Sequence, residues 1–340
     1  MKLQFEKNVD LLAHNTFGIS AIAREFARID QPEHVQEALE YVRQSKGNHL
    51  VLGGGSNILF TQDVDAIVLQ NRLFGIELEK EDDMHVYARV AAGENWHNFV
   101  LHCIRNKWAG VENLSLIPGC VGASPMQNIG AYGVEMSSVL NYVEAVNIHT
   151  SEKQIFSLND CELGYRESIF KRKEKGNWFI THVGFKLNKR PVFHIEYGAI
   201  AEELDKMEID TLSIKHISRA VIAIRTSKLP DPKILGNAGS FFKNPTVDLS
   251  VLRTIQTHDE KIPFYPVNEN TVKIPAGYLI EHTGWKGKRV GNCGVHEKQA
   301  LVLVNYGGAT GSEIYSLSTA VMTDVKNKYG IELEREVNVW

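Results

Sequence analysis

The sequence has few of the features that mark secreted, membrane-spanning or nucleic-acid-binding proteins. None of its 340 residues belong to an apolar run approaching the ~18–20 residues that span a bilayer. The first ten residues, MKLQFEKNVD, lack the apolar core of a secretory signal. The formal net charge of −4 is not the basic excess of a general nucleic-acid binder. We therefore expect a cytoplasmic protein that binds neither nucleic acid nor membranes.

Cysteine is scarce, and no metal motif is complete. The four cysteines lie far apart, at positions 103, 120, 161 and 293, and form no CxxC pair. This pattern suits reduced thiols better than a disulfide framework. HEKQ at 296–299 begins like the metalloprotease motif but lacks its second histidine. We expect no metal site.

The remaining composition is that of an ordinary globular protein, with 43% apolar and 23% charged residues. A chain of this length holds two or three domains at ~100–200 residues each. Apolar spacing predicts helices over 34–45, 95–107, 213–228, 248–256, 275–282 and 312–330. It predicts strands over 49–55, 66–71, 85–93, 142–150, 178–187, 300–306 and 331–340. Long loops fill 110–133 and 229–245, so the chain is predicted to be α+β or mixed α/β in three parts.

Two glycine-rich loops are candidates for ligand binding. GGGSN (53–57) follows a predicted strand, and IPGCVGASPMQNIGAYG (117–133) has four glycines and no charged residue. Small side chains let the backbone approach a ligand closely, and successive N–H groups can converge on an anion. A pyrophosphate with a flat ring system is the ligand that suits such loops.

Other interpretations of these loops stay open. GGGSNI lacks the third glycine of the Rossmann fingerprint, and no GxxxxGK[ST] motif is present. GGGSN alone is more typical of a tight turn after a strand. The longer loop favours a ligand, because long loops in compact domains are usually functional.

A third candidate is NAGSFFKNP (237–245), in which Ser240 sits between a glycine and two phenylalanines. Polar and basic residues surround it: Arg225, Lys228, Lys243 and Asn244. Such a cluster can hold nucleotide phosphates by charge-assisted hydrogen bonds. The alternative is a solvated loop anchored by a buried Phe-Phe pair.

Two single charges complete the candidates. Arg166 lies among aromatic residues in GYRESIF (164–170), where a carboxylate could be gripped bidentately, although a lone arginine is more often a surface ion-pair partner. Glu336 lies in the final alternating segment, on the same face as Glu332 and Glu334. By itself that pattern indicates a solvent-exposed strand face.

Taken together, these segments resemble the UDP-N-acetylenolpyruvoylglucosamine reductase family. The resemblance covers nearly the whole chain, and its motifs occur in the family's order and at similar spacing. They are NTFGI (15–19), GGGSN (53–57), GENW (93–96), LIPGCVGASPMQNIGAYG (116–133), GYRESIFK (164–171), RTSKLPDP (225–232), GNAGSFFKNP (236–245), AGYLIE (276–281) and EREV (334–337).

The resemblance implies an α+β fold. It has a two-lobed FAD-binding domain of the vanillyl-alcohol-oxidase/PCMH-like type and a C-terminal α+β substrate-binding domain. We expect the first lobe to cover 1–72. The second lobe should cover 73–225 and include an inserted loop with Tyr197, which marks a subgroup of the family. The substrate-binding domain should cover 226–340, with its final strand returning to the flavin site.

The resemblance also assigns expected roles to individual residues. The expected catalytic residues are Ser240, Arg166 and Glu336. The expected FAD contacts are Gly53, Gly54, Gly55, Ser56, Asn57, Pro118, Gly119, Gly122, Ala123, Ser124, Gln127, Asn128, Gly130, Ala131, Gly133 and Arg225. The expected contacts to the UDP diphosphate are Tyr197, Lys228 and Asn244.

The implied reaction is the NADPH-dependent, FAD-mediated reduction of UDP-N-acetylglucosamine enolpyruvate to UDP-N-acetylmuramate, a step of peptidoglycan synthesis. Arg166 would stabilise negative charge on the substrate carboxylate, and Ser240 would deliver a proton to carbon. Glu336 would help if it is protonated or orients a donor. A monomer is expected.

Two alternatives remain at this point. One is another FAD oxidoreductase acting on an alcohol or sugar. The other is a nucleotide-sugar-binding protein without catalysis.

Overall fold

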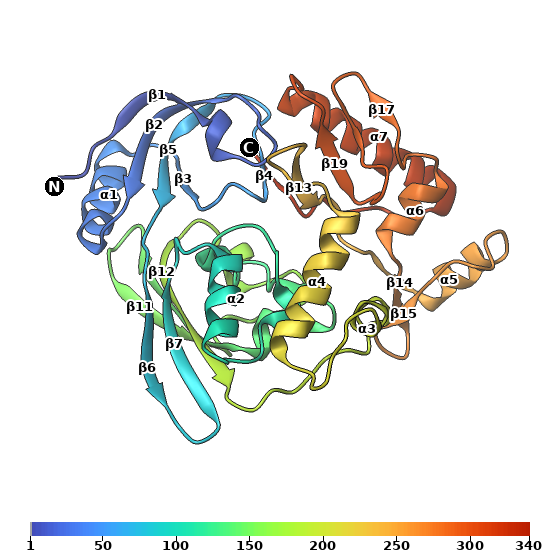
Figure 1. Ribbon diagram of the computed structural model, residues 1–340. Helices are drawn as coiled ribbons and strands as arrows, with labels where there is room; N and C mark the ends of the chain where they lie inside the picture. Colours follow the sequence, from blue (N-terminus) through green and yellow to red (C-terminus); the bar gives the residue numbers. More distant parts are fainter. Residues whose placement is uncertain (1) are drawn as a thin grey trace. The chain divides into compact units, whose positions relative to one another are not determined.

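The computed structural model describes residues 2–340 and contains both helices and strands, as expected for an α+β protein (Figure 1). The chain forms two compact units. The first comprises Met1–Val9, Ala23–Gly54 and Asp65–Ser227, and the second comprises Asp10–Ile22, Gly55–Val64 and Lys228–Trp340. The GGGSN loop therefore passes from the first unit to the second between Gly54 and Gly55.

The first unit begins with a four-stranded sheet covered by one helix. The strand order is β1 (Glu6–Asp10), β2 (Ile22–Ile29), β5 (Val64–Asn71) and β3 (His49–Leu52). Helix α1 (Pro32–Ser45) has a proline in its first turn, a position where the missing N–H is not needed. It buries Val35, Ala38, Leu39 and Val42, which pack against Ile29, Ile67 and Leu69 of the sheet.

A five-stranded sheet forms the rest of the first unit, together with three helices. Its order is β11 (Lys153–Ser157), β10 (Leu140–Asn147), β12 (Trp178–Asn188), β7 (His85–Ala91) and β6 (Ile76–Glu81). The strands pair antiparallel from β11 through to β6. The helices are α2 (Trp96–Arg105), α3 (Gly198–Asp205) and α4 (Ile214–Lys228), whose last residue falls in the second unit. A short hairpin joins β8 (Gly130–Ala131) and β9 (Val134–Glu135).

The second unit is built on small sheets and helix α7. One sheet has the order β13 (Gly236–Ser240), β19 (Val302–Asn305), β18 (Cys293–Val295) and β17 (Arg289–Val290). Another has the order β14 (Thr246–Asp248), β16 (Thr271–Lys273) and β15 (Tyr265–Pro266), and β20 (Asn338–Val339) pairs with β4 (Ile58–Leu59). The helices are α5 (Leu249–Gln256), α6 (Ala276–His282) and α7 (Gly311–Tyr329).

The six predicted helices are all present, and two predicted segments need correction. Within the predicted loop 229–245, residues Gly236–Ser240 form strand β13, paired antiparallel with β19. The predicted strand 331–340 is extended chain that pairs only at Arg335 and over Asn338–Val339. In both places the partner strand is distant in sequence, so the local pattern alone could not define the ladder.

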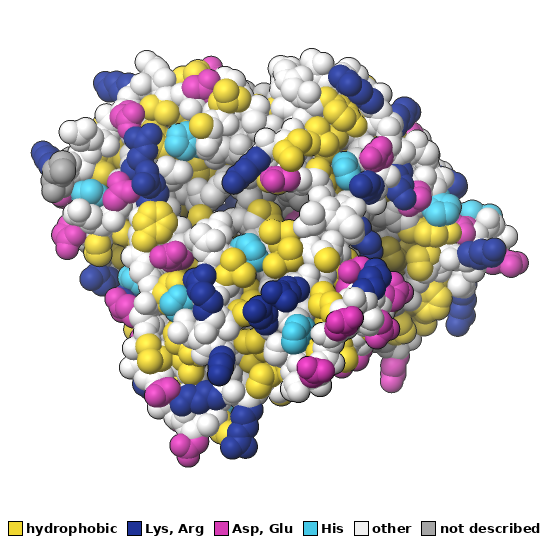
Figure 2. Space-filling view, viewed as in Figure 1, with side chains coloured by type: hydrophobic (Ala, Val, Ile, Leu, Met, Phe, Trp, Pro, Cys, Tyr) yellow, Lys and Arg dark blue, Asp and Glu magenta, His cyan; other side chains and the backbone are white. Residues whose placement is uncertain are grey.

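On the face that Figure 2 shows, Lys and Arg side chains are interspersed with Asp and Glu and with apolar groups. This face carries no continuous basic stripe of the kind that follows a phosphate backbone. Among residues 2–340, no helix is both long enough and apolar enough to cross a membrane.

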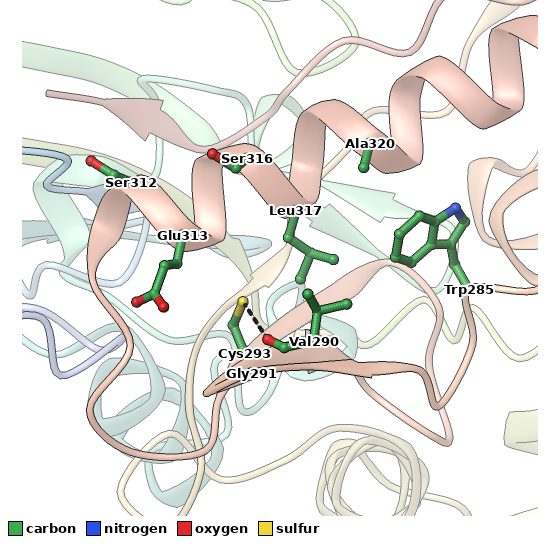
Figure 3. A pocket seen from close by; sticks show the side chains of 9 residues that line it. All are labelled: Trp285, Val290, Gly291, Cys293, Ser312, Glu313, Ser316, Leu317 and Ala320. Carbon is green, nitrogen blue, oxygen red and sulfur yellow. Dashed lines mark hydrogen bonds between the residues drawn. The ribbon is translucent and has the colours of Figure 1, made fainter.

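A cavity of about 420 Å³ lies in the second unit, between α7 and the β17–β18 hairpin (Figure 3). Its lining residues are Trp285, Val290, Gly291, Cys293, Ser312, Glu313, Ser316, Leu317 and Ala320. The Cys293 thiol donates to the carbonyl of Val290 at 3.4 Å, and burial raises its pKa. Glu313 forms the capping box of α7 with Thr310. The cavity contains no residue predicted to bind or react, so it is not the candidate active site.

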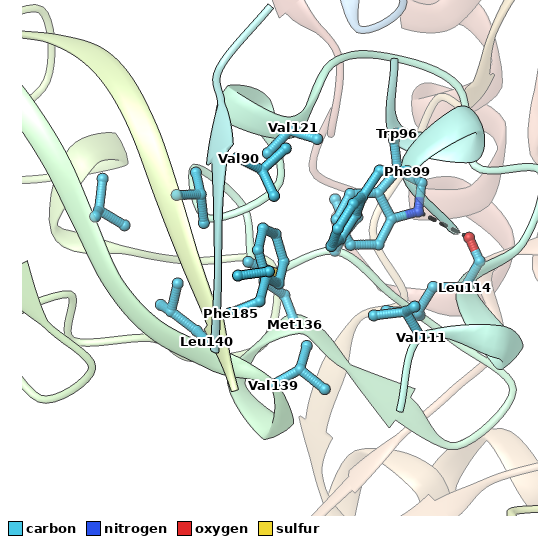
Figure 4. Close-up of a cluster of buried hydrophobic side chains, with 14 of the residues drawn as sticks. Val90, Trp96, Phe99, Val111, Leu114, Val121, Met136, Val139, Leu140 and Phe185 are labelled. Atoms are coloured by element: carbon cyan, nitrogen blue, oxygen red, sulfur yellow. Dashed lines mark hydrogen bonds between the residues drawn. The ribbon is translucent and has the colours of Figure 1, made fainter. Parts of the chain in front are cut away.

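The core of the first unit packs α2 against the five-stranded sheet (Figure 4). The ring of Phe99 lies 4.5 Å from that of Phe185 on β12, and the Trp96 ring lies 5.7 Å from Phe99, centroid to centroid. The indole N–H of Trp96 donates to the carbonyl of Leu114 at 2.9 Å. Aromatic packing and one buried hydrogen bond therefore fix the start of α2.

We predict that Phe99→Ala lowers the free energy of unfolding of the first unit by about 3–5 kcal/mol, because the truncated ring leaves a cavity in a closed aromatic cluster. Phe74→Ala is the matched control, since the Phe74 side chain is 61% exposed. It should change stability by less than about 0.5 kcal/mol. Urea unfolding followed by tryptophan fluorescence measures both. Equal effects of the two substitutions would contradict the packing described for α2.

Candidate active site

Residues 92–96, between β7 and α2, hold the first part of the predicted ligand loop by backbone hydrogen bonds. The N–H of Trp96 donates to Gly119 O at 3.0 Å. In the other direction, Val121 N–H donates to Glu94 O at 2.8 Å and Gly122 N–H to Ala92 O at 2.9 Å. This short segment therefore acts as a template for the loop.

The first two glycines of GGGSN lie against the longer loop within the first unit. A Cβ added to Gly54 would meet the Gly119 Cα at 3.4 Å and the Cys120 sulfur at 3.5 Å, and one on Gly53 would meet Cys120 at 3.6 Å. The Gly54 N–H also bonds to the Cys120 thiol. Burial raises the pKa of that thiol. The two loops that the sequence assigned to one ligand thus lie side by side here.

The loop follows its path in backbone conformations that few residues adopt. Gly119 and Gly133 have φ of +112° and +81°, which glycine tolerates. Leu116, Asn128 and Tyr132 also have positive φ, at +60°, +44° and +50°. Strained backbone of this kind persists only where the surroundings hold it, and it is concentrated at functional sites.

Arg166 lies at the tip of a tight turn against the loop. The N–H groups of Gly164 and Glu167 each donate to the other residue's carbonyl, at 3.0 and 3.2 Å, and Arg166 between them has φ of +56°. Its guanidinium donates to Gly130 O at 3.0 Å and to Asn128 O at 3.4 Å. The arginine is therefore a fixed part of the loop's surroundings and not a mobile surface residue.

The buried side chain of Asn128 connects the loop to the turn that carries Arg166. Its amide nitrogen donates to the Glu135 carboxylate at 2.8 Å and to Gly164 O at 3.1 Å. Its amide oxygen accepts from Ser137 N–H at 2.9 Å. These three bonds are within the protein, so they make Asn128 a positioning residue for Arg166.

Arg225 is a half-buried cation beside the start of the loop. Its Nε donates to Leu116 O at 3.2 Å, and burial lowers the pKa of its guanidinium. Among the described residues of the first unit, no carboxylate forms an ion pair with it. A desolvated charge is costly unless it meets an opposite charge. An anionic ligand at this end of the loop would supply one.

Tyr197 lies beside the other end of the loop. It precedes α3, and its ring packs edge-on against that of Tyr132, with centroids 5.9 Å apart. The buried Asn113 amide donates to Tyr132 O at 3.0 Å and to His194 O at 2.8 Å, which ties the Tyr197 segment to the loop. The Tyr197 side chain is 55% exposed, so its face is accessible to a ligand.

In the second unit, the remainder of GGGSN contacts the final segment of the chain. Gly55 has φ of +63°, and a Cβ there would lie 2.0 Å from His14 O, so only glycine fits. Its carbonyl accepts from Thr16 N–H at 3.0 Å. The Asn57 amide donates to Glu336 O at 3.4 Å.

Ser240 and Glu336 lie on paired backbone segments. Ser240 ends β13 and is exposed. The next residue, Phe241, is buried and accepts the Glu336 N–H at 2.8 Å, and Phe242 forms an antiparallel bridge with Arg335. Glu336 is half-buried. The second unit therefore brings these two predicted catalytic residues together.

The predicted diphosphate ligands of the second unit differ in their surroundings. Lys228 is exposed at the end of α4. The side-chain oxygen of Asn244 accepts from Ala276 N–H at 2.9 Å and so stabilises the start of α6. Lys243, which the sequence grouped with them, is buried and forms an ion pair with Glu334 at 2.5 Å.

The other predicted cofactor residues lie along the same loops. Pro118 and Ala123 are exposed, and Gln127 is half-buried. Ser124 is buried and its hydroxyl donates to Val121 O at 2.6 Å, so it stabilises the turn. Gly130 and Ala131 form β8, and Ser56 is half-buried beside Asn57.

The predicted residues fall into two groups, one in each unit. The first unit gathers Gly53, Gly54, the loop from Pro118 to Gly133, Arg166, Tyr197 and Arg225. The second gathers Gly55, Ser56, Asn57, Lys228, Ser240, Asn244 and Glu336.

Three supporting residues were missed: His97, Asn113 and Glu135. His97 directly follows GENW in the sequence, and its ring accepts the Leu116 N–H at 2.9 Å. Its place directly after GENW was the only feature of the sequence that pointed to His97. Asn113 acts through a partner far along the chain, His194, and Glu135 acts through Asn128 across the β8–β9 hairpin; the sequence reveals neither contact.

The site fits FAD on its own geometry. Glycines allow close backbone approach, the polar groups around the loop are mainly neutral, and Arg225 offers a positive charge. Within residues 2–340, no cluster of three or more histidine, cysteine or acidic side chains is arranged to hold a metal.

Comparison with known proteins supports this assignment. Residues 23–157 match the family model described as FAD binding domain. Residues 231–340 match the model described as UDP-N-acetylenolpyruvoylglucosamine reductase, C-terminal domain. The expected combination of a FAD-binding domain with a C-terminal domain of this family is therefore confirmed.

Full-length relatives agree. The UDP-N-acetylenolpyruvoylglucosamine reductases of Pseudomonas syringae pv. tomato, Flavobacterium johnsoniae and Bacteroides fragilis are 46%, 48% and 45% identical to this chain. The alignments cover 100%, 99% and 98% of this chain and 100%, 100% and 99% of the relatives.

The crystal structure of the UDP-N-acetylenolpyruvylglucosamine reductase from Thermus caldophilus has the same fold. Its TM-score is 0.67 at 24% identity, and the match covers 100% of this chain and 99% of that one. Similarity from end to end, joined to two glycine loops that lie side by side and to a half-buried arginine at the start of the longer one, leads to one conclusion. This chain belongs to the UDP-N-acetylenolpyruvoylglucosamine reductase family.

Proposed function

We propose that this chain reduces UDP-N-acetylglucosamine enolpyruvate to UDP-N-acetylmuramate for peptidoglycan synthesis, with NADPH as reductant and FAD as cofactor. The observation that carries this proposal is the full-length similarity to reductases named for this substrate. The FAD binding domain match over residues 23–157 supports the flavin requirement.

Gly53, Gly54 and the loop from Pro118 to Gly133 are the residues that would hold FAD in the first unit, and Gly55, Ser56 and Asn57 those in the second. The N–H groups of Gly122, Ala123 and Ser124 are bonded within the protein, so the linked phosphates would rely on close backbone approach at the glycines and on the positive charge of Arg225. When bound, FAD supplies the two-electron chemistry that carries hydride from NADPH to the substrate. The protein contributes binding, orientation and electrostatics.

Arg166 is proposed to bind the substrate carboxylate. Addition of hydride to the methylene carbon of the enol ether moves negative charge toward that carboxylate. A guanidinium already oriented by Gly130 and Asn128 stabilises this charge without reorganising during the reaction. Arginine suits the task because its planar fork matches a carboxylate.

Ser240 is proposed to deliver the proton to the other alkene carbon. A hydroxyl is a weak acid, so this transfer requires a strongly basic carbon at hydrogen-bond distance. Glu336 lies on the backbone segment paired with the one that follows Ser240. We propose that it is protonated or orients a donor in this step.

Tyr197, Lys228 and Asn244 are proposed to bind the UDP diphosphate. The exposed Tyr197 ring and the exposed Lys228 ammonium are suited to contact a nucleotide. The oxygen of Asn244 is already bonded to Ala276 N–H, so its amide nitrogen is the atom suited to a phosphate.

We propose further that the chain works in the cytoplasm as a monomer, with small molecules as its partners and no nucleic-acid or membrane partner. The net charge of −4 favours small-molecule partners over nucleic acid. The proposed division is 1–72 and 73–225 for the two flavin lobes, the second with the Tyr197 insertion. Residues 226–340 form the proposed substrate domain.

The proposal predicts a specific spectral cycle for the purified protein. Its flavin absorbance should bleach when NADPH is added without oxygen, and it should return when UDP-N-acetylglucosamine enolpyruvate follows. Anaerobic visible spectroscopy measures both steps. If colour does not return with this substrate and returns only when air is admitted, the substrate assignment is wrong. A colourless protein that takes up no FAD would overturn the flavin assignment.

Ser240→Ala should separate the two half-reactions. Reduction of the flavin by NADPH should keep its wild-type rate, because Ser240 takes no part in it. Oxidation by the enolpyruvate substrate should slow by about 10²–10⁴-fold, the usual contribution of a general acid. Stopped-flow absorbance measures each rate. Ser250→Ala, an exposed serine on α5, is the control. A smaller loss in Ser240→Ala would count against the assignment.

Gly122→Ala should weaken FAD binding. Its new Cβ would lie 2.5 Å from the Ala92 Cβ and 3.1 Å from the Ala92 carbonyl, so the loop must shift. Overpacking of this kind costs about 1–3 kcal/mol. Gly47→Ala is the control, because its Cβ would meet only the flexible tip of Arg24. Fluorescence titration of each apoprotein with FAD compares them. Wild-type affinity in Gly122→Ala would show that the template does not position the loop.

A further inference from the structure

The loop that is proposed to bind FAD begins with a bend at Leu116. This residue has φ of +60°, a conformation that costs a residue with a Cβ ~1–2 kcal/mol. Leu116 directly precedes the predicted ligand loop, so its conformation sets the direction in which the loop leaves Ser115. Contacts outside the loop must hold the bend.

A side chain holds each polar backbone group of Leu116. Its N–H donates to Nδ1 of His97 on α2 at 2.9 Å, and its carbonyl accepts from Nε of Arg225 on α4 at 3.2 Å. The preceding Ser115 hydroxyl bonds to that of Ser218, also on α4, at 2.8 Å. Two helices therefore fix the bend from two sides.

The hydrogen bond to His97 defines the state of its ring. A backbone N–H can only donate, so Nδ1 must be the acceptor and the ring proton must be on Nε2. A protonated imidazole donates from both nitrogens and cannot make this bond. The bend at Leu116 is therefore compatible only with neutral His97.

We propose that His97 is a positioning residue for the flavin: its neutral ring holds the Leu116 bend, and protonation of the ring releases the start of the loop and weakens FAD binding. This inference rests on the proposed function, because it assumes that the loop binds FAD. His97, the residue after GENW, thus has a role that does not require contact with cofactor or substrate.

The charges around His97 favour the neutral form at ordinary pH. Burial lowers the pKa of His97 below 6.5, and the positive charge of Arg225 on α4 lowers it further. Arg105 on α2 and Glu94, which precedes that helix, act on the neighbouring His102. Ser115 and Ser218 carry no charge.

The direction of the pH effect follows from this lowered pKa. The unfolded chain takes up the proton near its ordinary pKa, before the folded chain does. The contribution of His97 to the stability of the folded chain is thus complete above about pH 6.5. It is lost as the pH falls through the lower folded-state value.

Three variants test the proposal. His97→Asn places an amide oxygen at the same number of bonds from the backbone as Nδ1, accepts the same hydrogen bond and does not titrate. His97→Leu removes the acceptor and leaves the Leu116 N–H unpaired. His102→Asn is the control. His102 lies on the same helix and burial also lowers its pKa, but its ring does not accept a hydrogen bond from the loop.

The measurement is the dissociation constant for FAD, from flavin fluorescence, between about pH 8 and about pH 5. In wild type and His102→Asn, affinity should fall about tenfold to hundredfold on acidification, the effect of an unpaired buried donor. His97→Asn should keep the high-pH affinity throughout this range. His97→Leu should bind weakly at every pH.

Acid weakening that persists in His97→Asn would overturn the proposal, as would wild-type affinity in His97→Leu. If His97→Leu does not fold, the comparison of His97→Asn with wild type still decides. If the wild-type protein binds no FAD at any pH, it is the proposed function that fails and not this inference. In that case, the hydrogen-exchange protection of the Leu116 amide tests the bend directly: it should fall with pH in wild type and not in His97→Asn.

Discussion

Backbone pairing of residues 92–96 with residues 119–122, extended by side-chain bonds from Trp96 and His97 to Leu114 and Leu116, is the interaction on which the candidate site depends. The loop anchors a few apolar side chains in the core, among them Val121 and Ile129, but its glycines contribute no side chain, and ordering each residue costs ~1–2 kcal/mol. A neighbouring segment must therefore hold it. That segment is itself closely packed, since a Cβ on Gly93 would lie 2.7 Å from the backbone N and O of Leu73. The chain at Leu73, just after β5, thus holds residues 92–97 in place, and these residues in turn hold the loop. A rigid scaffold of this kind lets small residues form a defined binding surface.

The same loop also orients the charge that the proposed chemistry requires. Arg166 has a left-handed backbone conformation at the tip of its turn, and Asn128 of the loop donates to Gly164 O of that turn and accepts from the Arg166 guanidinium. Strain of this kind is retained where the surroundings over-determine it. The benefit is electrostatic, because a charge that is oriented before the substrate binds needs no reorganisation in the transition state. A freely rotating surface arginine would lose that advantage to solvent and side-chain entropy.

Much of the fold was predictable, because helices and buried strands have local causes. The last helix carries a capping box at Thr310 and a left-handed glycine at Gly330, and both are visible in the sequence. Strand β13 was missed because it is rich in glycine. A long-range contact requires the glycine at position 236, since a Cβ there would lie 2.2 Å from Phe17 O. Composition singled out the proposed ligand loops, whereas the supporting His97 and Asn113 act through distant partners. Composition reveals which residues can approach a ligand, but not which residues hold them.

Glu336 shows why the sequence cannot separate a half-buried acid from its exposed neighbours. Alternation grouped it with Glu332 and Glu334, yet both of these are exposed and Glu336 is half-buried. The difference arises because the final segment pairs with two others, through Phe241 O and through the Asn57 amide, which is 279 residues away. Since β20 continues directly beside β4, the end of GGGSN and Glu336 belong to one paired structure. A displacement of the loop at Asn57 must therefore displace Glu336 as well, so that the proposed cofactor contact and the position of the proposed catalytic acid are coupled through the backbone.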